Sequence, residues 1–153
     1  MTTVAWDGKM LATDSQTTIS GHRRGSDICK LFFVEGHMIA LAGCPFRGQQ
    51  FLDWFEETAH GGSPSNPFGK DDDEAFSAVV IDPKGKCWEY DVHLSPIAIL
   101  GSDAWGSGAP FASALMAAGK TAKEAVEIIC RKRLDAFTGG KVQWAQVERR
   151  DKK

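Results

Sequence analysis

The sequence has no long hydrophobic run and no large excess of charge of one sign. No apolar stretch approaches the roughly 20 residues that a bilayer-spanning helix needs, and no charged-then-apolar signal sequence begins the chain. Eighteen basic residues face twenty acidic ones, for a formal net charge of −2. Phosphate binding needs a clustered positive field, so nucleic acid is excluded as a principal partner. We expect a cytoplasmic protein with no membrane partner.

Closely spaced cysteines are also lacking, because the four cysteines are scattered without a Cys-x-x-Cys pair. This spacing fits neither a metal site nor a disulfide framework. It predicts reduced cysteines that pack in the core of a cytosolic protein. The four histidines are equally dispersed, so none is given a catalytic role and neither a metal nor a cofactor is expected. The acidic run 71–74 is interpreted as a solvated loop, because calcium needs ligands that are more spread out.

The composition favours one compact domain over residues 1–153, with 148–153 as a charged tail. With 153 residues, 42% of them hydrophobic, the chain can bury a single core and hardly two. Hairpins and helices are both indicated, which predicts an α+β protein with antiparallel sheets. Strands are predicted at 28–34, 37–42, 75–81, 87–90, 96–100 and 142–147, and helices at 46–57, from 109 to Gly119, and from the capping box 121–124 to about 134.

The start of the chain predicts a β-hairpin. Asp7-Gly8 lies between the apolar runs 4–6 and 10–12, which is typical of a type I′ turn. The far end of the returning strand then lies beside the start of the first, so we expect Asp14 to lie near Thr2. Alternatively, Asp14 is an ordinary turn aspartate. The polar segment 15–27 that follows is interpreted as a loop.

Thr2 is the residue with the most specific chemical potential. Removal of Met1 would leave it as a free amino terminus, and its small side chain permits that removal. A terminal threonine can be a complete catalytic unit, because its hydroxyl is a nucleophile and its α-amine, with a pKa of roughly 7.7–8, is a base. Lys30 interrupts an apolar strand. It is either an edge residue that opposes aggregation or a cation that lowers the pKa of a nearby nucleophile.

These features occur in an order that resembles the β-subunits of the proteasome family, which includes the bacterial HslV peptidase. The matching positions are Thr2, Asp14, Lys30 and Gly43, followed by a Gly-Ser-Gly stretch around Ser107 and an Asp-Ala-Phe-Thr-Gly-Gly stretch that begins at Asp135 and contains Thr138. The resemblance implies a four-layer αββα sandwich, the N-terminal nucleophile hydrolase fold. Family members usually carry two long helices after the glycine motif. Only one fits here, so one helix is expected to be missing from one layer.

The resemblance also implies a threonine-type endopeptidase. Thr2 would be the nucleophile and the Gly43 amide the oxyanion hole. Lys30, held by Asp14, would supply positive potential. Ser107, Asp135 and Thr138 would orient the terminus. Thr17, Thr18, Ile28 and Leu41 would bind a peptide or unfolded protein substrate.

Unregulated proteolysis endangers a cell, so family members hide their threonines inside rings. We therefore expect a homo-oligomeric ring, with an ATP-dependent unfoldase ring as a possible partner. Two other functions remain open. One is an N-terminal nucleophile amidase that acts on a small amide. The other is a non-catalytic ring or scaffold subunit, because a retained Met1 would acylate the amine and abolish the base.

Overall fold

The computed structural model describes residues 2–19, 21–25, 27–69 and 76–148. The predicted acidic loop 71–74, Met1 and residues 149–153 of the predicted tail lie outside the described residues. Within the described part of the chain, no helix is both long enough and apolar enough to cross a membrane.

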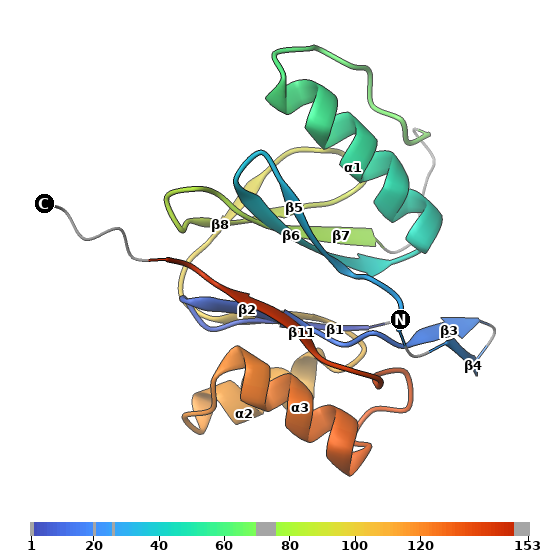
Figure 1. The fold of residues 1–153 in the computed structure, drawn as a ribbon, viewed down its shortest axis with the longest axis vertical. Coiled ribbons are helices and arrows are strands. Elements are labelled where there is room, and N and C mark those ends of the chain that lie inside the picture. Colours follow the sequence, from blue (N-terminus) through green and yellow to red (C-terminus); the bar gives the residue numbers. More distant parts are fainter. Residues whose placement is uncertain (1, 20, 26, 70–75, 149–153) are drawn as a thin grey trace, which may run out of the picture.

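The described elements stack in four layers, helix on sheet on sheet on helix (Figure 1). The five-stranded sheet has the order β5-β6-β7-β8-β9, and the four-stranded sheet has the order β10-β1-β2-β11. All strand pairs in both sheets are antiparallel, which confirms the predicted α+β class and sandwich. The strands are β1 (Thr3–Trp6), β2 (Met10–Thr13), β3 (Thr17–Ile19), β4 (His22–Gly25), β5 (Leu31–Val34), β6 (His37–Gly43), β7 (Phe76–Ile81), β8 (Cys87–Tyr90), β9 (Ile97–Ile99), β10 (Asp103–Gly106) and β11 (Gln143–Gln146).

Helix α1 (Pro45–Ala59) covers the outer face of the five-stranded sheet, while α2 (Ala109–Ala117) and α3 (Ala122–Lys132) cover the outer face of the other (Figure 1). The predicted capping box at the start of α3 is present, since Thr121 accepts from the Glu124 amide and Glu124 accepts from the Thr121 amide. The core between the two sheets is formed by inward-facing side chains such as Val4, Leu11 and Val79, all fully buried. This packing holds the ends of β1 and β6 in fixed relative positions.

The first hairpin has the predicted strands but a different turn. Trp6 pairs with Leu11, so the loop residues are Gly8 and Lys9. Among the residues of this turn only Gly8 has a positive φ, at 95°, as at the first central position of a type II′ turn. The predicted type I′ turn at Asp7-Gly8 is therefore wrong. The Asp7 carboxylate instead accepts the Lys9 and Met10 amides.

Two further expectations are corrected. Part of the predicted loop 15–27 forms a short hairpin of β3 and β4. Strand β5 begins at Leu31, so Lys30 lies in the segment that leads into the strand. Strand β10 had no prediction, because its four residues carry no run of apolar side chains. It pairs with the whole of β1.

On the outer face of the five-stranded sheet, α1 is the sole helix of the described residues, in agreement with the predicted loss of a helix. The segment after α1 covers part of the sheet face that α1 leaves uncovered. Phe68 is buried there, 5.5 Å from the ring of Phe76, and Asn66 donates to the Val92 carbonyl at 2.9 Å. A non-helical segment thus shields apolar side chains of this sheet in place of the missing helix.

Candidate active site

The first hairpin places Thr2 and Asp14 side by side, as expected from the sequence. Thr2 precedes β1 and is only 2% exposed, while Asp14 follows β2 and is fully buried. The Asp14 amide donates to the Thr3 carbonyl at 3.4 Å, which continues the strand pairing by one residue. The Thr2 hydroxyl donates to Oδ1 of Asp14. The antiparallel register therefore brings a hydroxyl and a carboxylate together.

Lys30 completes this group from the segment that leads into β5 of the other sheet. Its Nζ donates to Thr2 Oγ1 at 2.7 Å and to Asp14 Oδ1 at 2.9 Å, and its side chain is 11% exposed. Burial lowers the pKa of the Lys30 ammonium from its usual value, and the charge of Asp14 and its hydrogen bond oppose that shift. The result is a cation in direct contact with a hydroxyl oxygen.

Backbone amides hold the Asp14 carboxylate in place. It accepts from the amides of Thr3 at 3.3 Å, Gln16 at 3.3 Å and Gly139 at 3.0 Å. A buried carboxylate needs such donors, because removal from water costs several kcal/mol when the charge is left unpaired. Asp14 therefore anchors Lys30 from a position that the backbone already fixes.

A second polar group lies behind the threonine. Asp135 Oδ2 accepts from Ser107 Oγ at 2.6 Å and from Thr138 Oγ1 at 2.5 Å. Ser107 Oγ also lies 3.4 Å from the Thr2 carbonyl oxygen, and the Thr138 hydroxyl is 2.6 Å from the Thr3 hydroxyl. The structure thus gathers the three predicted residues around the main chain of Thr2. Thr3 had no predicted role.

The glycines beside Ser107 allow this close approach. A Cβ atom at Gly106 would lie 1.9 Å from the Thr2 carbonyl oxygen, and one at Gly108 would lie 1.9 Å from Thr3 Oγ1. Gly106 also has a φ of 90°, which favours glycine. The Gly-Ser-Gly stretch is therefore a steric requirement of the backbone packing at the start of β1.

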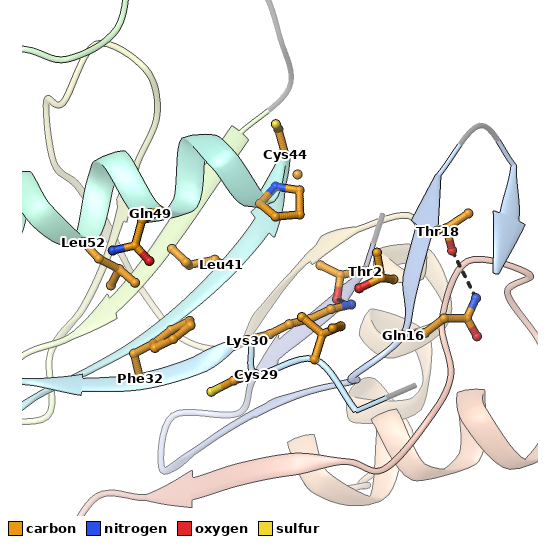
Figure 2. Close-up of a pocket in the computed structure, with 14 residues that line it drawn as sticks. Thr2, Gln16, Thr18, Cys29, Lys30, Phe32, Leu41, Cys44, Gln49 and Leu52 are labelled. Carbon is orange, nitrogen blue, oxygen red and sulfur yellow. Dashed lines mark hydrogen bonds between the residues drawn. The ribbon is translucent and has the colours of Figure 1, made fainter. Parts of the chain in front are cut away.

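An open cavity of about 520 Å³ lies in front of Thr2 and Lys30. The proposed oxyanion residue Gly43, at the end of β6, lines it, and so do all four predicted substrate-binding residues: Thr17, Thr18, Ile28 and Leu41. Figure 2 shows the Lys30 side chain extending towards Thr2, with Leu41 and Leu52 on the side of the cavity next to α1. The cavity is therefore accessible to a ligand that reaches the Thr2 hydroxyl.

Several cavity residues were not predicted from the sequence: Gln16, Phe32, Pro45, Gln49 and Leu52. Phe32 and Leu52 come from β5 and α1 and extend the apolar wall. Gln16 lies on the opposite side, where its side-chain Nε2 donates to Thr18 Oγ1 at 3.1 Å (Figure 2). The same Nε2 donates to the Ala136 carbonyl at 3.1 Å. Its polarity alone gave no signal, because the contact to Ala136 joins residues far apart in the chain.

The cysteines are free, as predicted, but two of them do not pack in the core. Cys44 was predicted to be a packing residue, and Cys29 to be buried. Both line the cavity, and Cys29 is exposed. Cys87 is buried, and burial raises the pKa of its thiol to about 12. Among the described side chains, no group of three or more could hold a metal ion.

Searches with protein-family models and among curated proteins found no match to this chain. Solved structures do match. BPH from Thiobacillus denitrificans superposes with a TM-score of 0.69 at 18% identity, covering 96% of this chain and 98% of that one. The same protein in complex with epoxomicin gives a TM-score of 0.72 at 18% identity, covering 96% and 100% of the two chains.

Eukaryotic HslV from Trypanosoma brucei gives a TM-score of 0.72 at 20% identity, with 97% of this chain and 99% of that chain covered. The chain therefore has an HslV-like fold, which confirms the predicted resemblance at the level of the fold. The likeness spans nearly the full length of each chain.

Proposed function

We propose that this protein is a threonine-type endopeptidase in which Thr2, freed by removal of Met1, is the nucleophile. One observation carries the proposal: the Lys30 ammonium contacts Thr2 Oγ1 at 2.7 Å at the edge of an accessible cavity. A buried cation next to a hydroxyl stabilises the alkoxide that forms when the hydroxyl attacks. The HslV-like fold and the epoxomicin complex of a structural neighbour agree with a peptidase.

In the proposed reaction, Thr2 Oγ1 attacks a peptide carbonyl while the Thr2 α-amine takes the hydroxyl proton, directly or through a water molecule. The Gly43 amide donates to the developing oxyanion. The amine then protonates the leaving nitrogen, and an ester links the acyl group to Thr2. Water hydrolyses this ester, with the amine again acting as the base.

The substrate is proposed to be an extended peptide or unfolded protein. Thr17 and Thr18, both in β3, would pair with the substrate backbone along one side of the cavity. Ile28, Leu41 and Thr17 would contact the side chain before the scissile bond. Since these side chains are apolar or neutral, an apolar residue at that position is favoured over a charged one.

The proposal includes a cytoplasmic, homo-oligomeric ring in which the active sites face an enclosed space, with an ATP-dependent unfoldase ring as a possible partner. It is supported by the likeness to HslV. The chain needs such control, because the cavity of the single subunit is open.

The function is tested by the variant Thr2→Ala, with Thr58→Ala as a matched control. Thr58 lies in the last turn of α1, where its hydroxyl donates to the Trp54 carbonyl at 2.8 Å, and it is exposed. Hydrolysis of an apolar fluorogenic peptide should be lost in Thr2→Ala and retained in Thr58→Ala. Full peptidase activity of Thr2→Ala would refute the proposed nucleophile.

A further inference from the structure

The side chain of Gln143 joins the two sheets next to the proposed active site. It belongs to β11, an edge strand of the four-stranded sheet, where it pairs with Thr13. Its Oε1 accepts from the Lys30 amide at 2.8 Å and from the Leu31 amide at 3.1 Å. Its Nε2 donates to the Ile28 carbonyl at 2.8 Å. One side chain thus makes hydrogen bonds to three residues of a single short segment.

This segment carries Lys30, and it lies outside the regular strands. Residues 27–30 precede β5, so the regular pairing of β5 with β6 starts after the lysine. Besides the Gln143 contacts, the backbone bonds here include the Ile28 amide to the Ser15 carbonyl at 3.0 Å and the Leu41 amide to the Lys30 carbonyl at 3.1 Å. Gln143 therefore supplies the acceptor for the Lys30 and Leu31 amides at the start of β5, where the regular pairing with β6 begins.

We propose that Gln143 is a positioning residue that acts through Lys30, and this proposal rests on the peptidase function proposed above. Holding the main chain at Lys30 fixes the origin of a long, flexible side chain. The ammonium must reach Thr2 Oγ1 and Asp14 at once, at 2.7 and 2.9 Å. Loss of the three hydrogen bonds made by the Gln143 side chain would let the segment withdraw from Thr2. A small displacement of a catalytic group such as the Lys30 ammonium strongly reduces the rate.

A change in the position of Lys30 has a specific electrostatic signature. A nearby ammonium disfavours protonation of the Thr2 α-amine and so lowers the pKa of that amine. If Lys30 withdraws, the pKa of the amine rises, and the amine becomes a free base at a higher pH. The acidic limb of the rate profile should then shift to higher pH. A residue that only stabilised the fold would lower the amount of active protein without moving this limb.

The test compares Gln143→Met with Gln146→Met, two substitutions of the same type on the same strand. Methionine keeps the length of the side chain and removes its amide. Gln146 is exposed and pairs with Met10 at the other end of β11. In Gln143→Met, kcat should fall by about tenfold or more, and this factor should exceed the factor of any rise in KM. The acidic limb of the pH–rate profile should move to higher pH. Gln146→Met should match the wild type in both respects.

Amide hydrogen exchange provides a readout that does not need activity. The Lys30 and Leu31 amides should exchange faster in Gln143→Met than in the wild type, and they should be unchanged in Gln146→Met. Equal kcat, equal pH profiles and equal exchange in the two variants would overturn the positioning role. If the wild type with a free Thr2 amine has no peptidase activity, the proposed function fails. Unchanged exchange in Gln143→Met would then overturn the structural basis of this inference as well.

A second pair of variants keeps the inference testable if Gln143→Met does not fold. Gln143→Glu retains an oxygen acceptor for the two amides, and Gln146→Glu adds the same charge on the same strand. Because the acceptor is retained, kcat of Gln143→Glu should stay within about threefold of the Gln146→Glu value. A loss of more than about tenfold, with Lys30 and Leu31 still protected from exchange, would contradict the role of these contacts.

Discussion

Replacement of Lys30 by methionine tests the electrostatic part of the site most sharply. Methionine fills a similar volume and removes the charge, while Asp14 keeps its backbone donors at Thr3, Gln16 and Gly139. The carboxylate is therefore not left without partners, and we expect the variant to fold. The 2.7 Å contact to Thr2 Oγ1 disappears.

The size of the effect follows from that distance. Two opposite unit charges 2.7 Å apart attract by about 6 kcal/mol at an effective dielectric constant of about 20. A hydrogen bond to a charged group, measured by mutation, contributes up to about 3 kcal/mol. At about 1.4 kcal/mol per factor of ten, kcat of Lys30→Met should fall by roughly 10² to 10⁴.

The assay is steady-state hydrolysis of an apolar fluorogenic peptide by protein with a free Thr2 amine. Lys120→Met is the matched control, because Lys120 is exposed in the loop between α2 and α3. Lys30→Arg should not restore activity, since a planar guanidinium cannot take the place of an ammonium. A folded Lys30→Met enzyme with a kcat within threefold of the Lys120→Met value would refute the assigned role.

Three further predictions concern stability and specificity. Gly108→Ala places a Cβ against Thr3 and should lower the free energy of unfolding by about 1–3 kcal/mol in urea denaturation; an unchanged midpoint would contradict the steric argument. Burial lowers the pKa of Lys30 in the folded state, so the unfolded chain binds more protons between that pKa and about 10.4. The stability of the wild type relative to Lys30→Met should therefore rise with pH through this window, measured by denaturation at a series of pH values, and a fall would reverse the sign of the shift. Peptides with an apolar residue before the scissile bond should be cleaved in preference to charged ones by about 1–3 kcal/mol in kcat/KM; preferred cleavage after lysine, arginine or glutamate would remove the assignment of Ile28 and Leu41.

The sequence predicted the elements whose signals are local. The apolar runs on either side of Asp7-Gly8 predicted two strands, and the Thr121–Glu124 capping box predicted the start of a helix. The structure has strands and a helix at these places. The turn type was wrong, because it depends on which residues of the loop pair across the hairpin. The hairpin of β3 and β4 was missed, since its polar residues lack the apolar alternation of a buried strand.

The proximity of Thr2, Asp14 and Lys30 could be predicted partly from hairpin geometry and partly from the resemblance. Gln143 could not, because its role arises only when β11 lies beside the segment that leads into β5. The same holds for Phe68, whose burial depends on the path of a loop after α1. Such contacts join residues far apart in the chain, and single-sequence periodicity carries no signal for them.

The central claim is that Thr2 reacts as a free amino terminus, and the mass of the protein after treatment with epoxomicin tests it most directly. Epoxomicin is the ligand in one of the similar structures. The account predicts that protein from its native host lacks Met1 and gains the mass of one epoxomicin molecule, with the adduct on the peptide that begins at Thr2. Protein that retains Met1 and gains no mass would contradict the account.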